Sequence, residues 1–468
     1  MIKQWRLDTQ NQSLVLSSLG NRLPCVIYWG DSLPSHESPD EMFEASKKDW
    51  GDNLIDLVPE LSILPEQTAN FAGQLGCKIR DLSGQLLSSS FVFSADKASN
   101  NSVTLIYKDK DLGLTYTATI DAMIEDDVFA LGAKIESIDP IIMEWLSAPV
   151  IETSLLSDKM LDYGGHWGGE FRKQTTPWVT GVHLRESRTG TTSHAHFPGL
   201  IIPSVGSSEN AGSCYGFHYG WSGGHRMVAE QLQDGRKQIQ FGHTENSELI
   251  PGKSFETAKL YITHSGDGAG GVGRTFRAFV SNSLVDLPKD SIRPVHYNCW
   301  EAVYFDHNIE ELKEIATIAA EIGAERFVLD DGWFKGRNTA KTSLGDWSVD
   351  DQKYPEGMHP LVKHIHSTGM TFGLWFEPEM VSPDSDLFRS HPEWIMGEES
   401  QALGRGQYVL DISIKEVQEY LFESIDSILN EYPIEYVKWD HNRVLPYPDA
   451  SQTRALYSLL GRLREAYP

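Results

Sequence analysis

A cation, a carboxylate and an amide stand at alternate positions near the end of the segment YPIEYVKWDHN, residues 432 to 442. The β-branched and aromatic residues in this segment predict a strand, and side chains alternate between the two faces of a strand. Lys438, Asp440 and Asn442 should therefore point to one side, and Trp439 to the other. Because a lysine beside a carboxylate favours its ionised form, Asp440 could attack an anomeric carbon as a glycosidase nucleophile. The alternative is that these residues have no catalytic role and form a salt bridge at an ordinary strand end, with a capping asparagine.

Two adjacent carboxylates end a second apolar run. Asp330 and Asp331 follow Phe327 to Leu329, and Gly332 turns the chain after them. Paired carboxylates at a strand end could accept hydrogen bonds from vicinal hydroxyls or chelate a cation. No histidine or third acid stands nearby in the sequence at ligand spacing, which favours hydroxyls over a metal. An Asp-Gly turn with a helix-capping acid is the alternative without function.

Tryptophan recurs in or just after the predicted strand ends, at Trp300, Trp333, Trp375 and Trp394. An indole face can pack on the C–H face of a sugar ring, although most single tryptophans belong to a protein core. The recurrence at several strand ends is what favours a carbohydrate ligand.

Further candidates have weaker signals. Arg405, in GRGQYVLDIS, could orient a carboxylate, and a surface arginine fits the pattern nearly as well. Glu377 and Glu379 end a strand in FEPEM and could serve as an acid or support a catalytic residue. Histidine pairs such as His194 and His196 could bind a metal, but a structural role is favoured.

Composition narrows the possible partners. Asp and Glu exceed Lys and Arg by 66 − 40 = 26, so the chain should repel nucleic acid and anionic membranes, and a neutral substrate fits better. The amino terminus lacks a signal-peptide pattern and no run of ~18 apolar residues occurs, which predicts a cytoplasmic protein. The four scattered cysteines predict free thiols and fit no zinc spacing, so no structural metal is indicated.

The elements that must position these residues fall into two regions. Residues 1 to 270 consist of short alternating runs such as LTYTATIDAM, separated by Gly, Asn, Asp and Ser turns, and predict a large antiparallel β-sandwich. Residues 271 to 290 read as an amphipathic helix and a proline-bounded connector, a linker between domains.

From 291 to 468 the pattern changes to strand, loop and helix, which predicts βαβ units with parallel strands. Polar residues at the carboxyl ends of such strands are the catalytic positions of a (β/α)8 TIM-type barrel. Four βα units can be counted where a closed barrel needs eight. The predicted fold class is therefore multidomain β plus α/β, with about the first half of a barrel. The chain is expected to be a fragment or to obtain the closing half of its barrel from elsewhere.

The motifs NCWEAVYFDH, VLDDGWF, GLWFEPEMV, RGQYVLDIS and KWDHNR together resemble the glycoside hydrolase family 36 α-galactosidases, over essentially the whole chain. The resemblance implies an amino-terminal β-supersandwich before the catalytic barrel. It also implies Asp440 as the nucleophile and, as contacts to the galactosyl unit, Asp330, Asp331, Arg405, Lys438 and Asn442. Trp300 and Trp375 would help to shape the sugar subsite.

The same resemblance implies no metal or nicotinamide cofactor and a homo-oligomer, often a tetramer, in which a neighbour's sandwich loop reaches over the active site. The matching loop would lie near residues 37 to 53, with Trp50 and Asp52 as its candidates. The family's acid/base aspartate follows a later cysteine- and glycine-rich segment, and no residue of this sequence can be given that role. The chain alone is therefore expected to be inactive on ordinary galactosides.

The implied reaction is retaining hydrolysis of terminal α-linked D-galactose from melibiose- or raffinose-type oligosaccharides, through a covalent galactosyl-aspartate. The paired acceptors Asp330 and Asp331 could select the axial 4-hydroxyl of galactose. A related α-N-acetylgalactosaminidase or transglycosidase remains open. So does a non-catalytic carbohydrate-binding protein, which would bind sugar reversibly and form no adduct.

Overall fold

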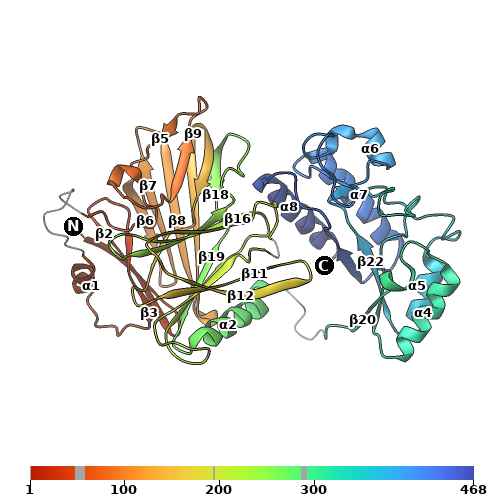
Figure 1. The fold of residues 1–468 in the computed structure, drawn as a ribbon, viewed down its shortest axis with the longest axis horizontal. Coiled ribbons are helices and arrows are strands. Elements are labelled where there is room, and N and C mark those ends of the chain that lie inside the picture. The colour runs from red at the N-terminus through yellow and green to blue at the C-terminus, as the bar shows by residue number, and fades with distance from the viewer. Residues whose placement is uncertain (1, 48–57, 193–194, 286–291) are drawn as a thin grey trace. The chain divides into compact units, whose positions relative to one another are not determined.

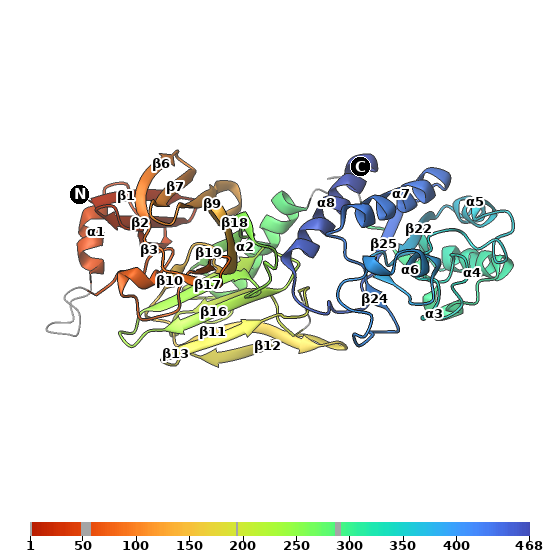
Figure 2. The same cartoon turned by 90° about the horizontal axis from the view of Figure 1, so that it is seen from above.

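The structure is a computed structural model that describes residues 2–47, 58–192, 195–285 and 292–468. Trp50, Asp52 and His194 lie outside the described residues. The chain divides into two compact units, Met1–Asp286 with Pro448–Ala450 and Leu287–Tyr447 with Ser451–Pro468. Figure 1 and Figure 2 show layers of strands in the first unit and strands flanked by helices in the second. No helix in the described part of the chain is long and apolar enough to cross a bilayer.

The first unit is built from antiparallel sheets. The largest, of 12 strands, runs in the order β12-β11-β14-β15-β19-β9-β8-β7-β6, and β18, β4 and β5 join it through β9. A four-stranded sheet has the order β10-β17-β16-β13, and a three-stranded sheet the order β1-β2-β3. The strands are β1 Ile2–Asp8, β2 Gln12–Leu19, β3 Cys25–Asp31, β4 Cys77–Arg80, β5 Leu86–Leu87, β6 Val92–Ala98, β7 Ser102–Asp109, β8 Leu114–Met123, β9 Val128–Leu146, β10 Ile151–Thr153, β11 Lys159–His166, β12 Gly169–Pro177, β13 Gly181–Glu186, β14 Gly199–Pro203, β15 Cys214–Tyr219, β16 His225–Gln231, β17 Lys237–His243, β18 Gly252–Glu256 and β19 Leu260–Ser265.

Alternation of polar and apolar residues explains this sandwich. In β8 every second side chain is buried, from Leu114 through Tyr116, Ala118 and Ile120 to Ala122, while the residues between them are partly exposed. These side chains belong to one continuous apolar core that extends through all three sheets. Burying a large apolar side chain stabilises the folded protein by roughly 1.5–3 kcal/mol. A shift of the strand by one residue would expose all of these side chains, so the apolar face sets the register.

Among the described residues of the first unit, two α-helices accompany the sandwich. Helix α1 spans Pro39–Ser46 and begins at Ser38, whose hydroxyl accepts from the backbone N of Glu41. Helix α2 spans Gly268–Phe279, packs against β14, β15 and β19, and continues into the π-helical turn η3, Val280–Leu284. The sequence assigned residues 271 to 290 to a linker; α2 instead packs within the first unit.

The second unit contains a four-stranded parallel sheet. Its order is β20-β21-β22-β25, which is also the order along the chain. The strands are β20 His296–Asn298, β21 Arg326–Leu329, β22 Thr371–Phe376 and β25 Tyr436–Trp439. A separate antiparallel pair joins β23 Met380–Val381 to β24 Tyr408–Val409. The segment YVLDIS contains β24 and therefore lies outside the parallel sheet.

One or more helices follow each parallel strand along the chain. They are α3 Trp300–Val303, α4 Ile309–Glu321, α5 His359–Ser367, α6 Asp386–Ser390, α7 Lys415–Glu431 and α8 Ala450–Ala466. Helix α4 begins at Asn308, whose side chain accepts from two backbone N–H groups of the first turn. It buries Leu312, Ala316 and Ala319 and stops before Gly323, whose φ of 97° suits glycine. The predicted fold class, a β-sandwich followed by part of a (β/α) barrel, is confirmed.

Candidate active site at the carboxyl ends of the parallel strands

Polar side chains meet where the parallel strands of the second unit end. Asn298 is the last residue of β20, Asp330 and Asp331 follow β21, Glu377 follows β22, and Asp440 follows β25. Because parallel strands end at one edge of their sheet, residues more than 140 positions apart in sequence come together there. This edge carries Asp330, Asp331, Glu377 and Asp440, four of the residues that the sequence singled out.

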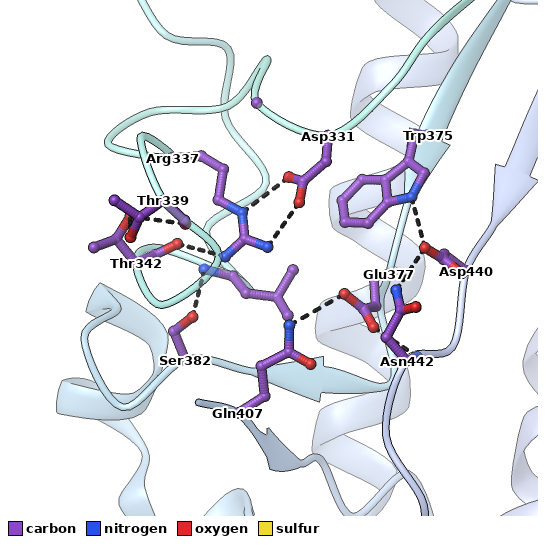
Figure 3. Close-up of polar contacts among 12 residues, drawn as sticks. Asp331, Arg337, Thr339, Thr342, Trp375, Glu377, Ser382, Gln407, Asp440 and Asn442 are labelled. Atoms are coloured by element: carbon purple, nitrogen blue, oxygen red, sulfur yellow. Dashed lines mark hydrogen bonds and ion pairs between the residues drawn. The ribbon is translucent and has the colours of Figure 1, made fainter. Parts of the chain in front are cut away.

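Asp440 is oriented by three hydrogen bonds. Its Oδ2 accepts from Trp375 Nε1 at 3.1 Å and from Asn442 Nδ2 at 2.6 Å (Figure 3). Its Oδ1 accepts from the backbone N of His441 at 3.0 Å. The backbone N of Asp440 donates to Phe376 O at 2.8 Å, which extends the pairing with β22 beyond the end of β25. The side chain remains partly exposed. A fixed, accessible carboxylate is what covalent attack on a sugar requires.

Asp330 is the partner of Lys438. The ammonium of Lys438 donates to Asp330 Oδ2 at 2.7 Å, and Asn298 Nδ2 donates to the same oxygen at 2.5 Å. The side chain of Asp330 is 4 % exposed and that of Lys438 is 36 % exposed, so solvent reaches the pair through the lysine. The sequence placed Lys438 beside Asp440; in the structure its hydrogen bond goes to Asp330.

Asp331 is held by Arg337, a residue that sequence reasoning missed. Arg337 Nε and Nη2 donate to Asp331 Oδ1 and Oδ2 at 2.9 and 2.8 Å, and Nη1 donates to Thr342 O at 2.8 Å (Figure 3). Arg337 is 0 % exposed. Burial raises the pKa of Asp331, and the guanidinium of Arg337 opposes that rise. The geometry is a forked ion pair that leaves little freedom to either side chain.

Glu377 lies beside the Asp440 segment and is 1 % exposed. Its Oε1 accepts from the backbone N of Asn442 at 2.8 Å, and its Oε2 accepts from Gln407 Nε2 at 3.3 Å. Burial, followed by the negative charge of Asp440, raises the pKa of Glu377 to about 7, whereas hydrogen bonds from Asn442 and the charge of Arg337 act in the opposite direction. This carboxyl is therefore poised to change its protonation state near neutral pH.

Glu379 contacts side chains on the opposite face of β25 and of the residues after it. It accepts from Trp439 Nε1 at 2.9 Å and pairs with His441 Nδ1 at 3.4 Å. Burial lowers the pKa of His441, but the hydrogen bond and charge of Glu379 outweigh it, so that the pKa is raised overall. Trp439 thus points away from Asp440, as strand alternation predicted.

The remaining predicted contacts lie in different surroundings. Trp375 is 1 % exposed, so the structure presents its indole N–H to Asp440 while its ring packs in the core. Trp300 begins α3, is partly exposed, and packs edge-on against Tyr304 and Phe305. Arg405 is exposed in a turn, with φ 53°, and its positive charge also opposes the raised pKa of Asp331.

Three functional candidates had not been identified: Asn298, Arg337 and Gln407. Asn298 had a usable signal, because it is a polar residue at the end of a predicted parallel strand. Arg337 and Gln407 lie in irregular loops, where no periodicity shows which way a side chain points. Among the described residues, no group of three or more His, Cys, Asp or Glu side chains is arranged to hold a metal ion.

Comparisons with known proteins cover both units. The Glycosyl hydrolase family 36 N-terminal domain model matches residues 22–249, and the Melibiase model matches residues 254–458. The chain is 35% identical to an alpha-galactosidase of Escherichia coli, over 100% of this chain and 67% of the relative. The chain therefore spans about two thirds of the length of that relative.

Solved structures agree with the sequence matches. Two variants of the family 36 alpha-galactosidase AgaA from Geobacillus stearothermophilus, in complex with stachyose and with raffinose, both superpose with a TM-score of 0.91. They are 27% and 26% identical to the chain, and each match covers 100% of this chain and 71% of the solved one. The chain belongs to glycoside hydrolase family 36, the family of these alpha-galactosidases.

Proposed function

We propose that this protein is a retaining α-galactosidase that releases terminal α-linked D-galactose, with Asp440 as its nucleophile. The observation that carries the proposal is the partly exposed carboxylate of Asp440, held by Trp375, Asn442 and His441 at the carboxyl end of a parallel strand. The alpha-galactosidase relatives support the reaction class. The relatives solved with raffinose and stachyose support galacto-oligosaccharides as substrates.

In the first step, an oxygen of Asp440 forms a bond to C1 of galactose while the bond from C1 to the leaving oxygen breaks. The leaving oxygen takes a proton from a general acid, to which no residue of this chain is assigned. In the second step, water attacks C1, gives its proton to the group that acted as the acid in the first step, and displaces Asp440, which regains its carboxylate. Two inversions at C1 yield galactose with the α configuration.

The other residues of the strand ends bind the galactosyl unit in this proposal. Asp330 would accept a hydrogen bond from a hydroxyl of the sugar, and Lys438 would donate one to a hydroxyl oxygen. Their contact with each other uses one N–H of Lys438 and one lone pair of Asp330, so that each residue keeps further capacity for hydrogen bonds. Asp331 keeps a lone pair on each oxygen beyond those that Arg337 uses. Asn442, Arg405, Trp300 and Trp375 complete the proposed set.

Assembly and location are separate proposals, and only the proposal on assembly rests on the family resemblance. We propose a homo-oligomer, with a tetramer as the first state to test by light scattering, and a cytoplasmic location. Both extend the function and neither is needed for the chemistry at Asp440.

The experiment uses α-galactosyl fluoride, whose fluoride leaves with little help from an acid. Proton NMR of the reaction should show α-galactose first, with the β anomer appearing later by mutarotation. Initial release of β-galactose would exclude a retaining mechanism. Reversible galactose binding without fluoride release would instead indicate a carbohydrate-binding protein, and faster reaction of the N-acetylgalactosaminyl analogue would identify an α-N-acetylgalactosaminidase. With an added acceptor sugar, a dominant transfer product would indicate a transglycosidase.

A further inference from the structure

A network of hydrogen bonds connects the buried carboxyl group of Glu377 to the proposed nucleophile. Figure 3 shows Asn442 between the two carboxyl groups. Its side-chain Nδ2 donates to Asp440 Oδ2 at 2.6 Å, and its backbone N donates to Glu377 Oε1 at 2.8 Å. One residue therefore joins a partly exposed carboxylate to a fully buried one.

Asn442 needs such an anchor because it lies beyond the sheet. Strand β25 ends at Trp439, and the last backbone pairing with β22 is made by the N–H of Asp440. Asn442 is two residues further on, in irregular backbone. Loops of this kind hold a side chain in place only where a specific contact fixes the backbone. The contact here is the bond from Asn442 N to Glu377.

Glu377 is itself fixed. It directly follows β22, so its backbone position is set by the sheet, and its second oxygen accepts from Gln407 Nε2. Gln407 is 0 % exposed, and among the described residues its Oε1 is buried without a hydrogen-bond partner. Rotation of this amide could offer Oε1 in place of Nε2, so the pocket around Glu377 can match either an acceptor or a donor there.

We propose that Glu377 is a positioning residue for the nucleophile: its carboxyl holds the backbone of Asn442, and Asn442 in turn holds Asp440. This inference rests on the proposed role of Asp440. Glu377 touches no reacting atom, and its effect on the reaction passes entirely through Asn442. Its acceptor Oε1 performs this function whether or not Oε2 carries a proton.

Two substitutions separate positioning from bulk packing. Glu377→Gln keeps the size and retains one oxygen, now that of an amide, which can accept from Asn442 N. Gln407 can rotate to accept from the new NH2 group. Glu377→Leu keeps the volume but leaves the N–H of Asn442 without its acceptor. Asp346→Asn is the matched control, because Asp346 is a half-buried carboxyl of the same unit that accepts from the backbone N of Asp386 and Leu387, at the start of α6.

The test measures the burst of fluoride from saturating α-galactosyl fluoride, which reports attack by Asp440. Glu377→Leu should slow the burst by about ten- to a hundred-fold, the effect of losing one buried hydrogen bond to a charged group. Glu377→Gln should stay within about three-fold of wild type, a difference too small for a lost hydrogen bond. Asp346→Asn should leave the burst unchanged. Thermal unfolding identifies any variant that fails to fold.

A double-mutant cycle tests the route through Asn442. If Glu377 acts only by holding Asn442, then Glu377→Leu should cost nothing further in an Asn442→Ala background. Additive losses in the cycle, or equal losses in the Gln and Leu variants, would overturn the proposal. If wild type itself releases no fluoride, the proposed function fails instead, so the two failures can be told apart.

Discussion

Arg337 donates to both carboxylate oxygens of Asp331, at 2.9 and 2.8 Å, in a pair that is almost wholly buried. The sequence had pointed to Arg405 as the arginine that could orient a carboxylate here. The two arginines differ in the structure: Arg337 is buried and binds Asp331, whereas Arg405 is exposed at a turn. Their different burial leads to different expected effects of mutation.

Arg337→Met should destabilise the protein by about 3–5 kcal/mol, because it leaves the carboxylate of Asp331 buried without its partner. Arg405→Met, its exposed counterpart, should change stability by less than about 0.5 kcal/mol. Chemical denaturation of both variants measures the difference. Equal stability of the two variants would contradict the role assigned to Arg337.

Trp375→Phe should slow attack on α-galactosyl fluoride by about ten-fold, because it removes the indole N–H that binds Asp440 Oδ2. Trp347→Phe is the matched control: Trp347 is also buried, packs near Trp375, and its Nε1 has no hydrogen-bond partner among the described residues. Both changes lose similar packing, so a comparable loss of rate in both would show that the hydrogen bond is irrelevant.

Asp330→Asn should weaken galactose binding by about ten- to a hundred-fold, because it removes a charged acceptor and the ion pair with Lys438. Isothermal titration calorimetry with galactose measures the affinity directly. Asp346→Asn, away from the strand ends, serves again as the control. Unchanged affinity in Asp330→Asn would remove Asp330 from the sugar site.

The raised pKa of Glu377 makes stability depend on pH. Between the usual value of 4.5 and about 7, the folded protein retains a proton that the unfolded chain has lost. The free energy of unfolding should therefore fall as pH rises through this window, by on the order of 3 kcal/mol at most, and level off above it. Burial also raises the pKa of Glu66 in the first unit to about 7, so that Glu66 lowers the free energy of unfolding as pH rises over the same window. The contribution of Glu377 is therefore measured by comparing wild type with Glu377→Gln.

The melting temperature of wild type should consequently drop more between pH 5 and pH 8 than that of Glu377→Gln. The charged groups that interact electrostatically with Glu377 in this pH range are Asp440, Arg337 and His441. Identical pH dependence in the two proteins would show that Glu377 does not titrate in this window.

Much of this site follows from strand periodicity. Asp330 and Asp440 were predictable because each follows a short apolar strand, and the carboxyl ends of parallel strands converge. The same logic explains why Trp439 faces Glu379 instead of the proposed nucleophile. The sandwich was likewise predictable, because apolar residues alternate with polar ones in segments such as β8, and the structure buries every second side chain there.

Contacts that cross between loops were not predictable. Which carboxylate Lys438 would meet depends on the spacing and twist of β21 and β25, and the structure selects Asp330. Arg337 lies six residues after Asp331 in a loop whose path is set by tertiary contacts. The sequence also could not tell whether Trp375 would face a ligand or the core, since a tryptophan at a strand end suits both.

The identity of the nucleophile is tested most directly by trapping it. An α-galactosyl fluoride with a second fluorine on the ring slows hydrolysis of the covalent adduct, so that the adduct accumulates and can be located by peptide mass spectrometry. The account predicts one fluorogalactosyl group on the peptide that contains Asp440, and none in Asp440→Asn. Labelling of a different carboxylate, or an unmodified protein after fluoride release, would contradict it.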